Sequence, residues 1–146
     1  MLQTPDLHAL LADYQIAFFA LAVAALIAPF QSLLSAPFAF FRREQVPGMP
    51  LRFNHSRTSF RVLRTYSNTV ESLPAFGFAV LLASVAGAAA GWVNGLAVVH
   101  VGFRLAFWAI YYAGIGKPAG GPRTLVYLGG LLCNIALSML ALVALA

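Results

Sequence analysis

Four polar side chains in the sequence share a spacing that suits ligand binding. Arg61, Arg64, Asn68 and Glu71 are separated by 3, 4 and 3 residues. In an α-helix with 3.6 residues per turn, this spacing puts all four on one face. Guanidinium groups bind carboxylates through a planar fork of N–H donors, and amide or phenol groups can complete the hydrogen bonds. The pattern therefore indicates a binding surface for a small, multiply charged anionic ligand.

Two later segments carry similar polar stripes at helical spacing. Their members are His100, Arg104, Trp108 and Tyr111 in the first segment, and Arg123, Tyr127 and Asn134 in the second. Arg104 is the only charged residue within its segment. If the three helices pack together, the three stripes can line one shared cavity.

The residues around these stripes are overwhelmingly apolar. The chain has 146 residues, of which 61% are hydrophobic and 9% are charged, and its mean hydropathy is +0.83. A chain of this length forms one domain, here residues 1–146, and a soluble domain of that size could not bury so much apolar surface. The composition therefore indicates a membrane protein.

Four apolar runs are long enough to cross the hydrocarbon core of a bilayer. They lie near 14–37, 61–87, 92–115 and 123–145, and about 20 apolar residues are needed for one span. Pro29 lies inside the first run and predicts a kink, because it lacks one helical hydrogen-bond donor. We expect an all-α membrane protein built as a bundle of four transmembrane helices.

The basic residues predict the orientation of this bundle. The loop 42–59 contains Arg42, Arg43, Arg52 and Arg57, and the segment 116–122 contains Lys117, whereas the turn 86–95 is uncharged. Cytoplasmic loops are enriched in Lys and Arg. Both basic loops are therefore predicted to be cytoplasmic and both termini to lie outside. The net charge of +5 reflects orientation and anionic lipid head groups rather than nucleic acid binding.

Ionisable residues inside the membrane are costly and need partners. Arg64 precedes Glu71 by two helical turns, so we expect the partner of Glu71 to come from another helix, with Arg104 as the candidate. One interpretation is a buried Glu71–Arg104 ion pair that fixes helix register. The other is a cavity in which these groups meet a ligand. His100 is expected to be either a satisfied interhelical histidine or a group that tunes Arg104.

Metal and disulfide chemistry find little support in the sequence. Cys133 is the only cysteine, which excludes an intramolecular disulfide, and no His/Cys cluster has metal-ligand spacing. We expect Cys133 to be a small buried hydrophobic residue and the protein to hold no metal.

The motifs resemble those of the MAPEG family, the membrane-associated proteins in eicosanoid and glutathione metabolism. The segment from Arg64 to Phe76 fits the pattern R-x-x-x-N-x-x-E-x-x-P-x-F. Arg104 followed by Tyr111, and Arg123 followed by Tyr127, are similar to the third and fourth helices of the family. The Tyr112-Ala-Gly-Ile turn is common in its bacterial-type members. The resemblance implies a homotrimer with a glutathione site at each subunit interface, facing the cytoplasm.

The resemblance also implies roles for individual residues. The glutathione-binding residues would be Arg64, Asn68, Glu71, Arg104, Tyr111, Arg123, Thr124 and Tyr127. Arg123, helped by the Thr124 hydroxyl, is the first candidate for stabilising the glutathione thiolate, and Arg104 is the alternative. A guanidinium group lowers the pKa of a nearby thiol, and the thiolate is the nucleophile.

The implied function is that of a glutathione-dependent transferase or peroxidase acting on lipophilic electrophiles or lipid hydroperoxides. Tyr66, Ser67 and the 117–122 segment depart from the family pattern and argue against an eicosanoid-specific activity. A non-catalytic membrane scaffold that uses the 42–59 loop is a second hypothesis, and an anion transporter ranks last. We expect a multi-pass protein of a bacterial inner membrane, with periplasmic termini.

Overall fold

The computed structural model describes residues 7–42, 54–117 and 120–146, and all the secondary structure in these ranges is helical. The helices are α1 (Leu7–Asp13), α2 (Gln15–Phe40), α3 (Thr58–Val85), α4 (Ala90–Ala113) and α5 (Pro122–Leu145). The predicted positions Arg43 and Arg52 lie outside the described residues.

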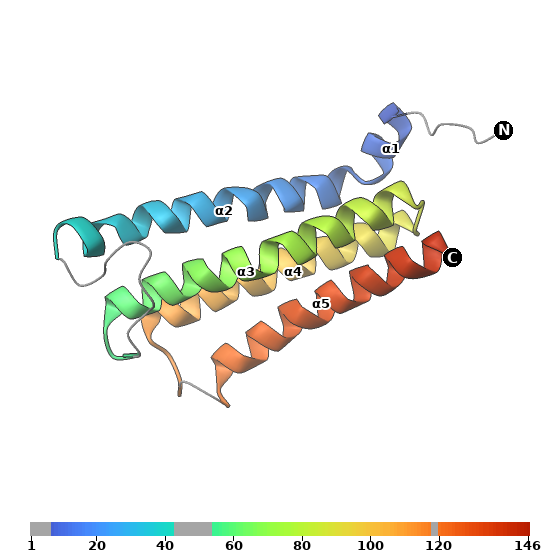
Figure 1. The fold of residues 1–146 in the computed structure, drawn as a ribbon. Helices are drawn as coiled ribbons and strands as arrows, with labels where there is room; N and C mark the ends of the chain where they lie inside the picture. Colours follow the sequence, from blue (N-terminus) through green and yellow to red (C-terminus); the bar gives the residue numbers. More distant parts are fainter. Residues whose placement is uncertain (1–6, 43–53, 118–119) are drawn as a thin grey trace.

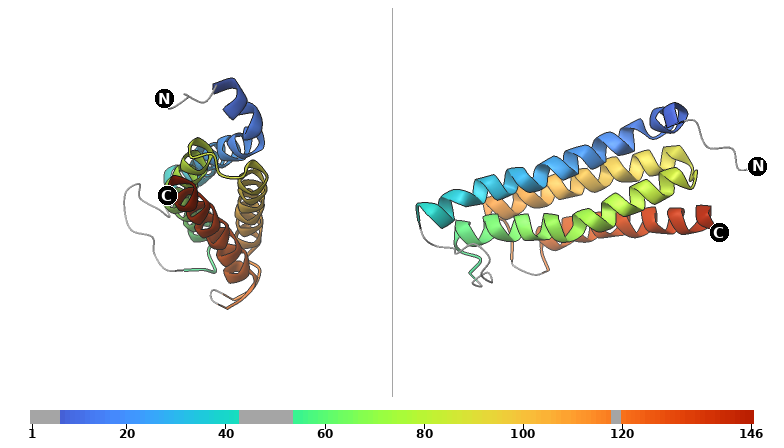
Figure 2. Two further views of the ribbon diagram at one scale, coloured as in Figure 1. Left: turned by 90° about the vertical axis from the view of Figure 1, so that its right-hand side faces the viewer. Right: turned by 45° about the horizontal axis from the view of Figure 1, so that its top comes forward.

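The four long helices run alternately up and down in one bundle, while the short α1 turns away from the end of α2 (Figure 1). Seen along the bundle, α1 projects to one side (Figure 2). Each of α2, α3, α4 and α5 is long and apolar enough to cross a membrane. The prediction of four membrane-spanning helices is therefore confirmed, and the protein is a multi-pass integral membrane protein.

Several helix boundaries differ from the predicted ones. Helix α2 continues past Pro29 and Pro37 without a break. Helix α3 begins at Thr58 rather than near 61, and α4 begins at Ala90, so the uncharged turn is shorter than the expected 86–95. Gly87, with φ of +74°, provides the left-handed conformation that this tight turn requires. Helix α1 was not predicted.

Small residues allow the helices to approach closely. Ala17, Ala20 and Ala24 of α2 are buried against α3 and α4, where Phe76, Ala79, Val80, Ala83, Val93 and Ala97 complete the core. In a bilayer the hydrophobic effect does not drive helices together, because lipid tails are as apolar as the side chains. Close van der Waals packing of this kind drives helix association instead. Large apolar side chains such as Phe19, Leu26 and Phe78 are exposed on the outside of the bundle, as expected for a surface in contact with lipid.

Polar contacts fix both ends of the bundle. At the end that holds the α3–α4 turn, Asn94 accepts a hydrogen bond from the Ala17 N–H (2.9 Å) and donates one to the Asp13 carbonyl (2.8 Å). The Tyr14 hydroxyl donates to the Ala88 carbonyl. At the other end, Gly114 terminates α4 with φ of +71°. The hydrogen bonds at the first end tie the start of α2 to α4 and to the α3–α4 turn.

Candidate functional site

A polar cavity lies between α3, α4 and α5, at the place where the three stripes meet. Its volume is about 170 Å³. The residues that line it are Asn68, Glu71, Ser72, Ala75, His100, Arg104, Tyr127, Gly130, Leu131 and Asn134. The cavity is therefore polar on all three of its walls, inside a bundle whose outer surface is apolar.

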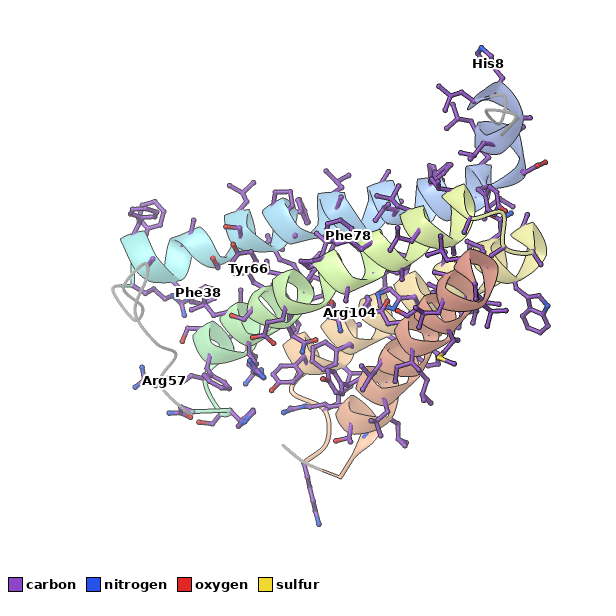
Figure 3. All side chains as sticks on the ribbon, turned by 45° about the vertical axis from the view of Figure 1, so that its right-hand side comes forward. His8, Phe38, Arg57, Tyr66, Phe78 and Arg104 are labelled. Atoms are coloured by element: carbon purple, nitrogen blue, oxygen red, sulfur yellow. The ribbon has the colours of Figure 1, made fainter. Side chains whose placement is uncertain are left out.

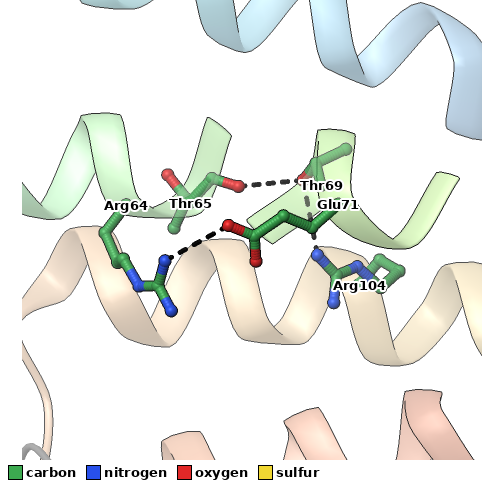
Figure 4. A network of polar contacts seen from close by, with 5 residues as sticks. All are labelled: Arg64, Thr65, Thr69, Glu71 and Arg104. Carbon is green, nitrogen blue, oxygen red and sulfur yellow. Dashed lines mark hydrogen bonds and ion pairs between the residues drawn. The ribbon is translucent and has the colours of Figure 1, made fainter. Parts of the chain in front are cut away.

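Arg104 is the cation of this cavity and is almost completely buried, with 8% of its surface exposed. Its Nη2 donates to the Thr69 hydroxyl at 3.5 Å, and that hydroxyl donates to the Thr65 carbonyl at 3.0 Å (Figure 4). Its Cζ lies 5.3 Å from the centroid of the Phe107 ring. Nε has no hydrogen-bond partner in the described part of the chain. Arg104 thus retains donor capacity for a ligand, at the heart of the bundle (Figure 3).

The carboxylate of the cavity has a different partner from the one expected. Glu71 Oε1 lies 3.5 Å from Arg64 Nη1 on its own helix, and the two side chains are 60% and 41% exposed (Figure 4). The expectation of a partner from another helix was wrong, because two long side chains can span two helical turns. The structure places the ion pair of Glu71 with Arg64 rather than with Arg104, so the predicted buried Glu71–Arg104 pair is not the one formed.

Two buried amide oxygens in the cavity wall lack partners. Asn68 on α3 and Asn134 on α5 are 6% and 8% exposed. Neither Oδ1 atom has a hydrogen-bond partner among the described residues. A buried acceptor without a donor costs about 1–3 kcal/mol. The cavity therefore has unused capacity to accept hydrogen bonds from N–H or O–H groups.

A second polar cluster lies next to the loops at the ends of α4 and α5. The guanidinium carbon of Arg123 lies 4.6 Å from the centroid of the Tyr111 ring, and its Nε donates to the Ile115 carbonyl at 2.9 Å. The Tyr111 hydroxyl is 3.4 Å from Nδ1 of His55, whose ring packs edge-on against Phe60. This cluster joins the loop before α3 to the α4–α5 connection.

The electrostatics of the second cluster keep its histidine neutral. Burial lowers the pKa of His55 below its ordinary value, and the positive charges of Arg123 and Arg64 lower it further. A third positive charge at this position would be repelled by both guanidinium groups. His55 therefore acts in this cluster as a neutral hydrogen-bonding ring.

A model of the MAPEG family matches residues 16–143 of the chain. The chain belongs to the MAPEG family. No curated protein and no solved structure matches it. The family match confirms the resemblance seen in the motifs, and it identifies the chain as a membrane protein of a family concerned with glutathione and eicosanoid metabolism.

The structure divides the predicted site residues of this MAPEG protein into two groups. Asn68, Glu71, Arg104 and Tyr127 line the cavity, and Arg64 is tied to it through Glu71. The remaining residues, Tyr111, Arg123 and Thr124, do not line it. The rings of Tyr111 and Tyr127 both lie near the Phe107 ring, with centroids 5.0 and 6.4 Å from it, so the two groups are adjacent.

Four residues considered in the sequence analysis lie outside the cavity lining. The Thr124 hydroxyl accepts a hydrogen bond from the Gly120 N–H at 3.1 Å, so it organises the start of α5. Arg61 leaves the predicted stripe and donates to the carbonyls of His55 and Ser56. Trp108 packs against Phe30 of α2. Cys133 is buried, as expected.

Three residues gain importance from the structure. Asn134 lay on a predicted polar stripe without being assigned to the site, and its buried oxygen now marks it as part of the cavity wall. His100 also lines the cavity. His55 lies in a loop, where no periodic pattern could have indicated its contact with Tyr111.

Within the described residues, no three His, Cys, Asp or Glu side chains are placed to hold a metal ion.

Proposed function

We propose that this MAPEG protein is a glutathione-dependent transferase or peroxidase that acts on lipophilic electrophiles or lipid hydroperoxides. The observation that carries the proposal is the composition of the cavity lining: a buried guanidinium, a carboxylate and two unpartnered amide oxygens, contributed by three helices. Glutathione offers the complementary groups, since it has two carboxylates, one ammonium and two amide N–H groups. Family membership supports the same ligand.

The thiol of bound glutathione requires a cation to form its reactive thiolate. A free thiol has a pKa of about 8.5, which a neighbouring guanidinium lowers. We favour Arg104 for this role, because it lines the cavity and its Nε has no partner in the described chain. Arg123, the first candidate from the sequence, becomes the second: its Nε donates to the Ile115 carbonyl, but its Nη1 is buried without a partner among the described residues.

The size of the cavity supports a site shared between subunits, and the family resemblance implies that the assembly is a homotrimer. Pockets that hold drug-sized ligands typically measure about 300–1,000 Å³, whereas this cavity measures about 170 Å³. A tripeptide would need further walls, and a neighbouring subunit would supply them. The lipophilic substrate would then reach the thiolate from the bilayer, past the exposed apolar side chains of the bundle.

The charge pattern supports a defined orientation. Arg42, Arg57, Arg61 and Lys117 lie at or beside the helix ends opposite the α3–α4 turn. By the positive-inside rule, this end faces the cytoplasm, where glutathione is abundant, and both termini are periplasmic in a bacterial inner membrane. Cysteines introduced at Arg57 and Gly91 should be labelled from opposite sides of sealed vesicles by a membrane-impermeant maleimide.

Calorimetry with the detergent-purified protein tests the proposal. Glutathione should bind the native chain, and both Arg104→Ala and Glu71→Gln should bind it much more weakly while remaining folded. Arg42→Ala is the matched control, because it removes an exposed cation that packs on Phe38 outside the cavity. Absence of binding to the native chain would refute the proposal and favour the scaffold hypothesis. Two turnover assays on protein that binds glutathione then distinguish the activities. Conjugation of a hydrophobic electrophile indicates a transferase, and reduction of a lipid hydroperoxide indicates a peroxidase.

A further inference from the structure

His100 is a buried residue of α4 with one ring nitrogen already committed. Its Nδ1 lies 3.0 Å from the Gly130 carbonyl oxygen. A carbonyl can only accept a hydrogen bond, so Nδ1 carries the hydrogen, and in the neutral ring Nε2 carries a lone pair. The ring stacks on Phe76 with centroids 4.1 Å apart and planes 14° apart, and only 2% of the residue is exposed. Both the orientation and the tautomer of His100 are therefore fixed by its neighbours.

His100 shares the cavity with one cation and two other titratable groups. The charged and titratable residues that line the cavity with it are Arg104 on its own helix, Glu71 from α3 and Tyr127 from α5. On its α2 side, only the apolar Ala24 and Ile27 share a small cavity with it. Among these described residues Glu71 is the other candidate proton acceptor, and its carboxylate is paired with Arg64.

We propose that His100 is a catalytic residue whose Nε2 accepts the thiol proton of bound glutathione. This inference rests on the proposed function. When glutathione binds, the S–H bond breaks and an Nε2–H bond forms, which leaves a thiolate beside Arg104 and an imidazolium at His100. With a conjugated carbonyl compound as the electrophile, the thiolate sulfur forms a C–S bond and the alkene electron pair moves onto the carbonyl system. The resulting enolate takes the proton back from Nε2, so the ring returns to its neutral form.

Proton transfer inside the cavity has an electrostatic advantage over proton release from it. The transfer creates one positive and one negative charge, so the net charge of the site does not change. The thiolate then lies beside two cations, Arg104 and His100, and fixed positive charges of this kind stabilise a developing anion. The Gly130 carbonyl adds to this, because a hydrogen bond from Nδ1 to an oxygen stabilises the imidazolium.

Nitrogen NMR of the native protein tests the inference directly. The chain has three histidines, so labelled His100 can be assigned by comparison with His8→Asn and His55→Asn. Without ligand, Nδ1 of His100 should be protonated and Nε2 bare. Saturating glutathione should protonate Nε2, whereas S-methylglutathione, which has no thiol proton, should bind and leave Nε2 bare. An Nε2 that stays bare when glutathione is bound would overturn the inference.

A substitution provides the kinetic test. In His100→Asn, the amide N–H can still donate to the Gly130 carbonyl, but Nε2 is absent. This variant should bind S-methylglutathione like the native protein, should form less thiolate at neutral pH as measured by ultraviolet absorbance, and should turn over about 10²-fold more slowly or worse. His8→Asn is the control, because His8 is an exposed histidine of the short α1, which contributes no residue to the cavity.

The outcomes separate this inference from the proposed function. If the native chain binds neither glutathione nor S-methylglutathione, the proposed function fails and the inference fails with it. If the native chain binds and turns over, and His100→Asn keeps the native thiolate titration and rate, only the role of His100 is refuted. Selective loss of thiolate in a folded, ligand-binding His100→Asn variant supports it.

Discussion

Replacing Asn134 with leucine should stabilise the ligand-free protein. Asn134 Oδ1 is buried in the cavity wall without a partner among the described residues, and the residue is 8% exposed. Leucine has a similar shape and no polar atoms. Removing a buried, unpaired acceptor recovers its desolvation cost of about 1–3 kcal/mol. We therefore expect the free energy of unfolding to rise, by no more than about this amount.

The same substitution should weaken glutathione binding. If a ligand N–H group supplies the missing partner of Asn134, then the leucine variant leaves that donor unpaired in a buried site. The cost is again about 1–3 kcal/mol, which corresponds to a dissociation constant raised about 5- to 150-fold. One change thus moves stability and affinity in opposite directions, which is the signature of a polar group kept for function.

Thermal unfolding in detergent and calorimetry with glutathione measure the two effects, and Asn94→Leu provides the matched control. Both polar ends of Asn94 are used, by the Ala17 N–H and the Asp13 carbonyl. Its replacement should lower the melting temperature and leave glutathione affinity unchanged. The reasoning is wrong if Asn134→Leu behaves like this control, because Asn134 would then be a structural residue.

Three further variants probe charged and titratable groups. Arg64→Ala should lower the free energy of unfolding by at most about 1 kcal/mol, because its ion pair with Glu71 is largely exposed; urea unfolding checks this, and a larger loss would mean that the pair is structural. Arg104→Lys keeps the charge but loses the planar fork, so calorimetry should show glutathione binding weakened about tenfold or more, and native affinity would show that charge alone suffices. The pKa of His55 in the folded protein is lowered by burial and by Arg123 and Arg64. As the pH falls, the His55 ring is therefore protonated in the unfolded chain before it is protonated in the folded one. The stability contributed by neutral His55 is complete above the ordinary pKa of about 6.5 and is lost as pH falls below it. His55→Asn should therefore flatten the acid side of the pH–stability curve, and an unchanged slope would contradict the environment assigned to His55.

The sequence is sufficient to predict the spans because hydrocarbon thickness sets their length. Boundaries are less well determined: Thr58 and Ala90 begin their helices outside the apolar runs, where hydrophobicity gives no signal. Helix α1 has seven residues, too few for a periodic pattern to identify it. Its position instead depends on tertiary contacts such as the hydrogen bond between Asn94 and the Asp13 carbonyl.

The three-walled cavity could be predicted because helical periodicity fixes which side chains share a face. Side-chain pairing could not be predicted in the same way. Arg64 and Glu71 are separated along the helix axis by about 10 Å, yet their extended side chains meet at 3.5 Å. The position of His55 depends on the path of a loop, to which no periodicity applies. Local geometry at the helix ends likewise decides that Arg123 lies on Tyr111 rather than in the cavity.

Three of the seven buried, unpartnered polar atoms of the described residues belong to residues of one cavity, and this grouping argues for a ligand there. A polar group that only joins helices should have its hydrogen bonds satisfied within the protein, as Ser84 does with the Val80 carbonyl. In the described chain, Asn68 Oδ1, Arg104 Nε and Asn134 Oδ1 come from three different helices, are all buried without partners, and belong to residues that line one cavity. Selection for stability alone would replace such groups with apolar residues, because their desolvation is costly in a membrane interior. A ligand that carries both donors and acceptors would offer partners to all three at once, and binding would then recover this desolvation cost.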